Sequence, residues 1–350
     1  MTPMSRGSAR ARGAGAARQA KQLAIQLARR AGMLPEGTPD RLADDHLLPG
    51  GRLAQSVMVY FPDTRMNLYQ LRQWYAPLRA LDEVHPVVVV LQDSRVARVV
   101  RRELGLPCVV FAHYSRLDDV LARSDVKLAL YVNHSPQNFS ALRFTSLVHV
   151  FLNHGESDKG VSVSNQVKAY DFCFVAGQAA IDRYARYTML FDAQARCRAI
   201  GRPQLDEDRP EVVARPAGSQ PTVLYAPTWE GAQPSLAYGS LRTHGPRLVR
   251  ALLDSGRFRL VYRPHPLNGL LDPAYGEADA EVRQLITEAA GRDPGAGHRV
   301  DTGDPLNRTF AAADLLVCDV SAVAQEFLPF DRPLVVTEPA SPEVVTAATR

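Results

Sequence analysis

The chain has 350 residues and a mass of 38.5 kDa, a length that accommodates about two domains, each with its own apolar core. Hydrophobic residues make up 46% and charged residues 22%, as in ordinary globular proteins, which excludes global disorder. No apolar run approaches the roughly 20 residues that cross a bilayer, so we expect no membrane-spanning helix.

The basic residues are concentrated at one end. Residues 1–30 hold seven Arg and Lys and no acid, so the remaining residues carry a formal charge of −3 within the net +4. This acidic body lacks aromatic-plus-basic motifs, which argues against nucleic-acid binding. Met1–Gly15 is expected to be disordered and Ala16–Ala31 to be helical. Two interpretations of that helix stay open: contact with anionic lipid headgroups, or a solvated or packed basic segment.

The cysteines and the N-terminus indicate the compartment. Four scattered cysteines form no C-x-x-C pair, which argues against disulfides and structural zinc and for a reducing environment. The N-terminus lacks the apolar region of a signal peptide. We therefore expect a cytoplasmic protein, peripheral on the inner membrane face if the N-terminal helix binds lipid.

From Gln55 the chain alternates strand-like and helix-like segments, which predicts a parallel sheet covered by helices on both faces. Strands are expected over Val57–Phe61, Pro86–Leu91, Cys108–Phe111, Val126–Val132, Ser146–Leu152 and Tyr170–Val175. Helices are expected over Asn67–Leu81, Ser94–Leu104, Leu117–Arg123, Phe139–Phe144 and Ala179–Tyr187.

A charged, Pro-rich stretch at 207–220 reads as a linker, and a second alternation follows it. Strands are expected over Thr222–Ala226, Phe258–Arg263, Leu315–Asp319 and Leu334–Val336, and helices over Arg247–Ser255, Ala278–Ala290 and Ala322–Phe327. The sequence thus predicts an α/β protein with two Rossmann-like, doubly wound lobes and an interlobe cleft. The expected domains are a basic, partly disordered segment (1–50), a first lobe for the acceptor (51–206), the linker (207–220) and a second lobe for the nucleotide donor (221–350).

Four short motifs follow predicted strands, where ligands bind in such folds. The first contains His154, Gly155 and Lys159. A histidine at a strand end suits a general base, and the lysine can offer its charge to a phosphate. The second contains Thr228, whose hydroxyl can donate a hydrogen bond.

The third motif places His265 between Pro264 and Pro266, directly after Arg263, and this rigid arrangement suits a pyrophosphate. The fourth contains Asp319, Ser321 and Glu326. Ser321 can cap the next helix, whose amides bind anions, and Glu326 can accept hydrogen bonds from ribose hydroxyls. Each motif alone has a structural explanation, such as a helix cap or a rigid loop, but together they favour function.

Together these motifs resemble the CDP-glycerol glycerophosphotransferase family, the GT-B-type polyol-phosphate transferases and polymerases of teichoic-acid synthesis, over roughly residues 145–340. The resemblance implies that His154 deprotonates the acceptor hydroxyl and that His265 stabilises the donor pyrophosphate or the leaving nucleotide. The other matching positions are Gly155, Lys159, Gly201, Pro203, Asp206, Tyr225, Pro227, Thr228, Pro266, Asp319, Ser321, Glu326, Arg332 and Pro333.

Two departures from the family pattern are visible. The family's Asp-Tyr-Ser-Ser is Asp-Val-Ser-Ala here, which removes one hydroxyl contact to phosphate. Family members usually continue past the last strand with helices that cross back onto the first lobe, whereas only Thr337–Arg350 follow it here. A truncated chain and an unusual ending both remain open.

The resemblance implies that an acceptor hydroxyl attacks the β-phosphorus of a CDP-linked alcohol such as CDP-glycerol and that CMP leaves. Cationic side chains and helix amides can replace Mg²⁺, so we expect no metal and no cofactor besides this co-substrate. The acceptor is expected to be lipid-linked or polymeric at the membrane surface. The polyol, the number of units added and the oligomeric state stay open.

Two alternatives remain. The first is a GT-B glycosyltransferase that uses a nucleotide sugar for capsule or cell-wall glycan. The second is a non-catalytic nucleotide-binding protein of an envelope-assembly complex.

Overall fold

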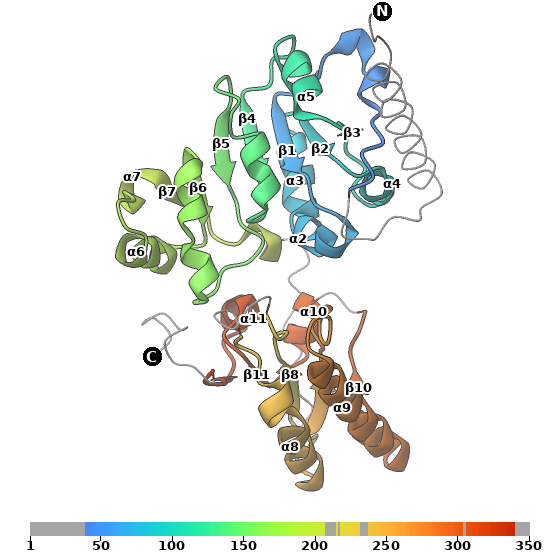
Figure 1. Ribbon diagram of the computed structural model, residues 1–350. Coiled ribbons are helices and arrows are strands. Elements are labelled where there is room, and N and C mark those ends of the chain that lie inside the picture. Colours follow the sequence, from blue (N-terminus) through green and yellow to red (C-terminus); the bar gives the residue numbers. More distant parts are fainter. Residues whose placement is uncertain (1–38, 207–214, 216–217, 232–236, 304–305, 340–350) are drawn as a thin grey trace, which may run out of the picture. The chain divides into compact units, whose positions relative to one another are not determined.

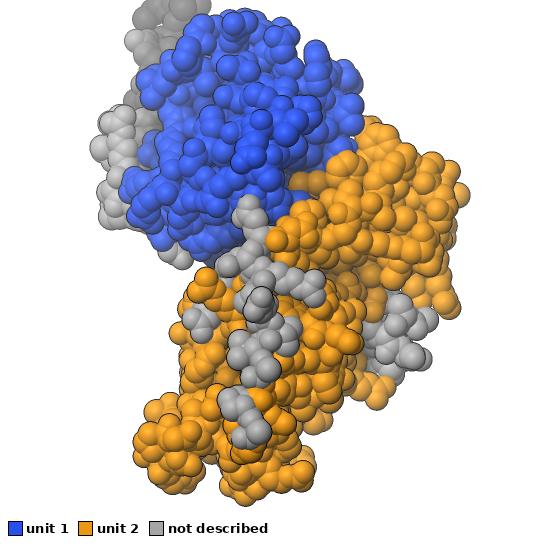
Figure 2. All heavy atoms as spheres, turned by 180° about the vertical axis from the view of Figure 1, so that it is seen from behind, with its two compact units in different colours: residues 1–150 blue, residues 151–350 orange. Residues whose placement is uncertain are grey.

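The computed structural model describes residues 39–206, 215, 218–231, 237–303 and 306–339. The chain divides into two compact units, residues 1–150 and 151–350, which are treated separately below (Figure 1, Figure 2). The strands form two sheets, ordered β3-β2-β1-β4-β5-β6-β7 and β10-β9-β8-β11-β12. Residues 1–38, which hold most of the predicted basic segment (1–50) and the whole helix expected over Ala16–Ala31, lie outside the described residues, as does most of the predicted linker. The domain boundaries stay predictions.

Unit 1 is built on parallel strands. β1 (Val57–Phe61) pairs with β2 (Val87–Leu91) on one side and β4 (Leu128–Tyr131) on the other, and β3 (Cys108–Val110) pairs with β2. All five residues of β2 are buried, as expected for a strand covered on both faces. The helices are α2 (Leu68–Arg72), α3 (Tyr75–Asp82), α4 (Ser94–Glu103) and α5 (Tyr114–Leu121), with short 3-10 helices η1 (Asp45–Leu47), η2 (Pro49–Gly51), η3 (Arg65–Asn67) and η4 (Pro136–Ser140).

Two helices of unit 1 differ from the sequence expectation. The helix expected over Asn67–Leu81 is interrupted between α2 and α3. Pro77 has no amide hydrogen to donate to the carbonyl of Gln73, and its ring would press on that carbonyl in a continuous helix. The helix expected over Phe139–Phe144 is instead η4, which begins earlier at a proline.

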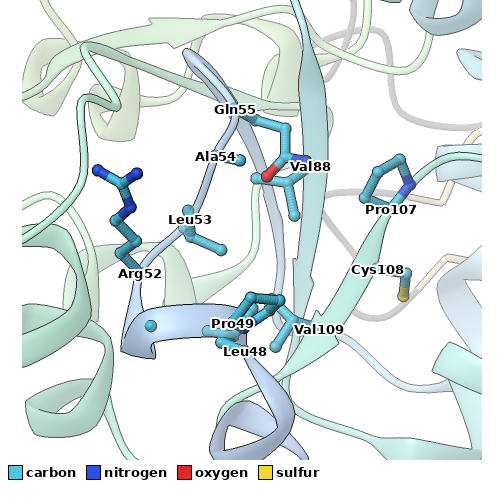
Figure 3. Close-up of a pocket in the computed structure, with 11 residues that line it drawn as sticks. Leu48, Pro49, Arg52, Leu53, Ala54, Gln55, Val88, Pro107, Cys108 and Val109 are labelled. Atoms are coloured by element: carbon cyan, nitrogen blue, oxygen red, sulfur yellow. The ribbon is translucent and has the colours of Figure 1, made fainter.

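A cavity of about 550 Å³ lies at the amino-terminal ends of β2 and β3 (Figure 3). Its walls come from the segment around η2 and from the two strands, and include Leu48, Leu53, Val88 and Val109. The lining is mostly apolar, with Arg52 also contributing. This edge of the sheet is opposite to the carboxyl ends of the strands, where ligands of doubly wound sheets bind.

Unit 2 begins at the last residue of β5 (Val148–Phe151) and contains the parallel pair β6 and β7 and the whole second sheet. Its strands are β6 (Phe172–Val175), β7 (Cys197–Ala199), β8 (Thr222–Ala226), β9 (Arg259–Tyr262), β10 (Arg299–Val300), β11 (Leu315–Cys318) and β12 (Leu334–Val336). Its α-helices are α6 (Gln178–Tyr187), α7 (Ala193–Arg196), α8 (Leu241–Asp254), α9 (Pro273–Arg292), α10 (Leu306–Ala311) and α11 (Ala322–Phe327). Short 3-10 helices are η5 (Gly160–Val163), η6 (Asn165–Ala169), η7 (Pro203–Leu205), η9 (Pro294–Ala296) and η10 (Leu328–Phe330).

The second sheet is covered on both faces, as the alternating pattern predicts. One core packs Tyr225 and Tyr262 against α8 and α9, which lie side by side in Figure 1. The other core packs Leu224 and Val261 against an aromatic cluster around Phe327 from α10 to η10. The two cores hold β8 and β11 at the centre of the sheet, so the loops after these strands have a rigid base.

Several elements of unit 2 were not expected from the sequence. β10 has two residues, and β7 has three, of which only the first is buried, so neither shows a strand pattern. α8 begins at Leu241, ahead of Pro246, because Leu241 is buried in the core and this packing outweighs the hydrogen bond that Pro246 cannot make. Among the described residues, the structure contains no helix with the length and apolar character required to cross a membrane.

Candidate active site

The loop that follows β5 carries the first motif and contacts α11. Asn153 adopts a left-handed conformation with φ of 57°, and its Oδ1 accepts the amide of His154 at 2.9 Å. A Cβ placed on Gly155 would lie 2.8 Å from the Cβ of Ala322, closer than real side chains approach. Glycine is therefore required here by the close approach of the loop to the start of α11.

Buried charges fix the same loop to α6. Arg183 of α6 is buried and its Nε donates to Asp158 at 3.0 Å, with Glu156 within 4.0 Å. Glu156 also accepts the amide of Ala176. Burial raises the pKa of Glu156, and its hydrogen bond and the two nearby arginines oppose that shift. The loop thus rests on a satisfied ionic network rather than moving freely.

Lys159 joins the first motif to the second. Its Nζ donates to Thr228 Oγ1 at 3.0 Å and lies 5.3 Å from the ring centre of Tyr238. The hydroxyl of Tyr238 accepts the amide of Gly160 at 2.8 Å. Burial lowers the pKa of Lys159 to about 8, and the negative charge of Asp319 opposes that shift. At neutral pH the site therefore holds a desolvated ammonium group, which attracts anions more strongly than a solvated one.

Asp319 organises the second and fourth motifs. It is fully buried, and its Oδ2 accepts the amides of Thr228 at 2.7 Å and Ser240 at 3.1 Å, while Oδ1 accepts the hydroxyl of Thr337. Burial raises the pKa of Asp319, and these hydrogen bonds oppose that shift. Direct donor binding by Asp319 stays a prediction, and the contacts shown here let it position the Thr228 loop.

His265 of the third motif is stacked on Trp229, with ring centres 6.1 Å apart and planes 16° from parallel. Its Nδ1 accepts the amide of Leu267 at 3.1 Å, which assigns the ring proton to Nε2 in the neutral form. Burial lowers the pKa of His265 to about 4, and the charge of Lys159 lowers it further. The imidazole is thus neutral at physiological pH and carries its proton on Nε2.

The side chain of Arg263 is fixed by an ion pair within unit 2. Its Nη1 donates to the buried Asp301 at 2.9 Å, and Asp301 also accepts the Thr309 hydroxyl at 2.5 Å. Its predicted contact with a donor pyrophosphate remains a prediction. Nearby, Glu230 accepts the amides of residues 269, 271 and 272 and so shapes the loop that follows His265.

The fourth motif differs in detail from the expectation. Ser321 occupies the N-cap position of α11, but its hydroxyl makes no cap hydrogen bond, so the predicted side-chain cap is wrong. The Ser321 Oγ is buried and has no hydrogen-bond partner among the described residues. The backbone at Ser321 is extended (φ −160°), as N-cap residues usually are, so the missing cap hydrogen bond reflects the orientation of the side chain and not of the backbone.

Glu326 is paired with a residue that the motif reading did not single out. Its Oε1 accepts Arg202 Nη2 at 2.5 Å, and Arg202 also approaches the His154 carbonyl at 3.4 Å. Burial raises the pKa of Glu326, and Arg202 opposes that shift. The predicted ribose contact stays a prediction, since a ribose hydroxyl would share this carboxylate with Arg202.

The structure therefore brings the motifs together through particular pairs. Lys159 connects the first motif to Thr228, and Gly155 connects it to α11. The sequence analysis did not single out three residues that make contacts in this site: Arg202, Tyr238 and Trp229. Arg202 lies within the Gly-x-Pro match and Trp229 directly follows Thr228, so both were adjacent to recognised positions. Tyr238 lies outside every motif and gave no local signal.

Among the described residues, no three His, Cys, Asp or Glu side chains are grouped so that they could hold a metal ion. The sequence does have an Asp-x-Asp spacing at Asp206 and Asp208, of which Asp208 lies outside the described residues. Metal independence accordingly stays a prediction.

The sequence of this segment matches a known protein family. Residues 153–341, more than half of the chain, match the family model of CDP-glycerol:poly(glycerophosphate) glycerophosphotransferase. The chain belongs to this family. The match confirms the predicted enzyme class, a glycerophosphotransferase with CDP-glycerol as the donor, and it spans all four motifs. No curated protein matches the sequence.

Solved structures resemble this family member in fold. A UDP-N-acetylglucosamine 2-epimerase from Rickettsia bellii aligns over 81% of this chain and 78% of its own, with 10% identity and a TM-score of 0.51. A glycosyltransferase from Rickettsia africae aligns over 83% and 86%, with 10% identity and a TM-score of 0.49. The wall teichoic acid polymerase TagF, in a variant soaked with CDPG, aligns over 91% and 77%, with 12% identity and a TM-score of 0.47.

Of these three scores only the first exceeds 0.5, and at such low identity the likeness concerns the fold alone. It agrees with the two parallel sheets of the structure, and the predicted α/β, GT-B-type fold is confirmed.

Proposed function

We propose that this chain transfers glycerol phosphate from CDP-glycerol to a hydroxyl group of a growing teichoic-acid-like polymer and releases CMP. The observation that carries the proposal is the hydrogen bond between Lys159 and Thr228 beside the neutral His265, within the family-matched segment. This bond puts a buried ammonium group in contact with a hydroxyl, and these two groups together with the imidazole of His265 would suit a diphosphate.

The proposed reaction is a single displacement at the β-phosphorus. His154 accepts the proton of the acceptor hydroxyl while the hydroxyl oxygen bonds to that phosphorus. The bond from the phosphorus to the oxygen bridging to CMP breaks, and CMP leaves with the electron pair. The proton on His154 then passes to solvent, and the new phosphodiester stays on the acceptor.

The leaving CMP carries the charge that the site must stabilise. Lys159 supplies a positive charge, and His265 donates Nε2–H to a phosphate oxygen without itself being charged. Ser321 has a buried hydroxyl with remaining hydrogen-bonding capacity and would bind the same phosphate. Because these groups already neutralise the charge that develops, the proposal includes no metal ion.

The reaction is proposed to take place at the membrane surface. The acceptor is a lipid-linked or polymeric chain at the inner membrane surface. The cluster of seven basic residues in 1–30 supports this, because such clusters are attracted to anionic headgroups.

The experiment compares donors. Purified full-length protein is incubated with CDP-glycerol or with UDP-sugars and a short glycerol phosphate oligomer, with and without EDTA. Released nucleotide is measured by chromatography and the oligomer by mass spectrometry. The proposal expects CMP release and a mass increase of one glycerol phosphate from CDP-glycerol, unaffected by EDTA.

Other outcomes contradict the proposal in distinct ways. Transfer of a sugar from a UDP-sugar would identify a glycosyltransferase. Binding of CDP-glycerol without turnover would identify a non-catalytic nucleotide-binding protein. Loss of transfer with EDTA that Mg²⁺ restores would overturn metal independence alone.

A further inference from the structure

Two of the four cysteines, which are scattered along the sequence, meet in the folded chain. Cys173 of β6 and Cys197 of β7 are separated in sequence by α6 and α7, and the parallel pairing of the two strands sets them directly opposite each other. Aligned residues of neighbouring strands point to the same face of a sheet, and both cysteines are buried. Both are free thiols in the structure.

This register satisfies the spacing that a disulfide requires. Neighbouring strands lie about 4.8 Å apart, and disulfides join residues whose Cα atoms are about 4.4–6.8 Å apart. The thiols of Cys173 and Cys197 already share a hydrogen bond, and Sγ of Cys173 also lies 3.9 Å from the carbonyl oxygen of Val167. A bond between the two sulfurs therefore requires side-chain rotation and little movement of the backbone.

The other two cysteines, which the structure also describes, have no cysteine opposite them. Cys108 faces Val89 across the pair β2 and β3. Cys318 faces Ala226 on one side and Val336 on the other. These two thiols are therefore internal controls for any reaction that depends on the paired arrangement.

The two paired thiols differ in reactivity. The hydrogen bond from Cys173 lowers the pKa of Cys197, and the charges of Arg196 and Arg198 lower it further, whereas burial opposes that shift. The same hydrogen bond raises the pKa of Cys173. Because the thiolate is the reactive form of cysteine, an oxidant reacts first with Cys197.

Cys197 also belongs to an element that opens at low cost. β7 is the edge strand at the end of its sheet, and its other two residues, Arg198 and Ala199, are exposed. It has three residues and follows the four-residue helix α7. Short edge elements of this kind open locally at lower free energy than central strands, so a small oxidant reaches Cys197 without global unfolding.

We propose that Cys173 and Cys197 form a reversible disulfide when the protein meets hydrogen peroxide, and that this bond fastens β7 to β6. The thiolate of Cys197 attacks one peroxide oxygen, the O–O bond breaks, and hydroxide leaves with the electron pair. The resulting sulfenic acid is attacked by the sulfur of Cys173, which loses its proton as the oxygen leaves as water. The hydroxide takes up the proton that Cys197 released, so two thiols and one peroxide give one disulfide and two waters.

The disulfide would hold a segment that leads to the candidate active site. Directly after β7, the amide of Ile200 donates to the carbonyl of Val175 at 2.9 Å. Two residues further, Arg202 donates to Glu326 at 2.5 Å. Oxidation should therefore make this stretch harder to open while leaving its contacts in place. The inference does not depend on the reaction proposed above.

The test treats purified full-length protein with hydrogen peroxide, removes the peroxide and alkylates the remaining thiols in denaturant. Mass spectrometry should find four alkylated cysteines in reduced protein and two after treatment, with one disulfide-linked peptide pair that contains Cys173 and Cys197. Dithiothreitol should restore all four. In hydrogen exchange, peptides that span β7 and Ile200 should exchange at least about tenfold more slowly in the oxidised protein, since disulfides stabilise by several kcal/mol.

Single variants separate the pair from the other thiols. Cys173→Ala and Cys197→Ala should each form no linked peptide and show no slowing of exchange. Cys318→Ala, a matched change of another buried strand cysteine, should form the link and slow exchange as wild type does. If either paired variant fails to fold by circular dichroism, the thiol count and the linked peptide of wild type decide the question.

Three results would overturn the inference. The first is wild type that keeps four thiols after peroxide treatment, or that gains oxygen on a single cysteine without a link. The second is a disulfide that joins either residue to Cys108 or Cys318 instead. The third is the expected disulfide with unchanged exchange in β7, which would show that the bond does not fasten the edge strand.

Discussion

Two polar clusters, around Lys159 in unit 2 and around Asp63 in unit 1, occupy equivalent ends of parallel sheets but differ in charge and in how their charged groups are satisfied. In unit 2, the ammonium of Lys159 lies beside the neutral His265, and the nearby carboxylate of Asp319 is fully engaged by amides and hydroxyls. In unit 1, Asp63 lies two residues after β1, and its carboxylate accepts Asn133 Nδ2 at 2.5 Å and is accompanied by no cation among the described residues. The comparison teaches that equivalent strand ends can differ in the charge that internal pairing leaves, a cation in unit 2 and a carboxylate in unit 1.

The largest expected effect comes from the contact that positions the His154 loop. Gly155→Ala places a Cβ where Ala322 already lies, so the loop must move away from α11. A displacement of about 1 Å costs roughly 100-fold in rate, and we expect a loss of that size in transfer. Steady-state CMP release measures it.

The double variant Gly155→Ala with Ala322→Gly removes the opposing methyl group and should recover most of the activity. Gly291→Ala, which adds a Cβ in open space on α9, is the control and should behave as wild type. Full activity of the single variant would show that this close approach does not matter.

The second prediction concerns the charge of Lys159 and how donor binding in unit 2 depends on pH. Burial lowers the pKa of Lys159 to about 8, so its ammonium loses its proton as pH rises through 8. The diphosphate prefers the charged form, and the Kd of CDP-glycerol should rise by up to about tenfold per pH unit above 8. Below about pH 7 it should be constant.

Lys159→Arg keeps its charge throughout this range and is the matched variant. Its donor Kd, measured by calorimetry between pH 6.5 and 9.5, should lack the rise above pH 8. A pH-independent Kd in wild type would remove Lys159 from donor binding.

The smallest effect concerns Ser321, whose buried hydroxyl has no partner among the described residues. Ser321→Ala should change the free energy of unfolding by less than about 0.5 kcal/mol, yet weaken donor binding by roughly three- to tenfold. Ser240→Ala is the contrast, because the Ser240 hydroxyl bonds Tyr225 at 3.0 Å. Its loss should cost about 1 kcal/mol in urea unfolding. An unchanged donor Kd in Ser321→Ala would assign that hydroxyl no role.

Local patterns were sufficient where apolar runs form central strands. The predicted bounds of β1 and β8 agree with the structure, because β-branched and aromatic runs bounded by turns leave few other assignments. The predicted bounds of the edge strand β12 and of the helix α11 agree as well. They failed at α2 and α3, where Pro77 interrupts an otherwise helical spacing, and at the two-residue β10, which has no pattern of its own.

The candidate site also has residues that local sequence patterns predict and residues that they do not. Motif residues such as His154, Thr228 and His265 were recognisable because they directly follow predicted strands. Their partners were not, because pairing is long-range. Arg202 contacts Glu326 across 124 residues of sequence, and Asn133 contacts Asp63 across 70. No local spacing encodes such contacts, and only the folded chain reveals which charges are already satisfied.

The central claim is that His154 activates the acceptor hydroxyl for attack on CDP-glycerol. The most direct measurement is acceptor-dependent CMP release by wild type and His154→Gln, with the Kd of CDP-glycerol determined for both. The account predicts that His154→Gln binds the donor within about twofold of wild type and transfers at least about 100-fold more slowly. Unchanged transfer by a variant that still binds the donor would contradict it.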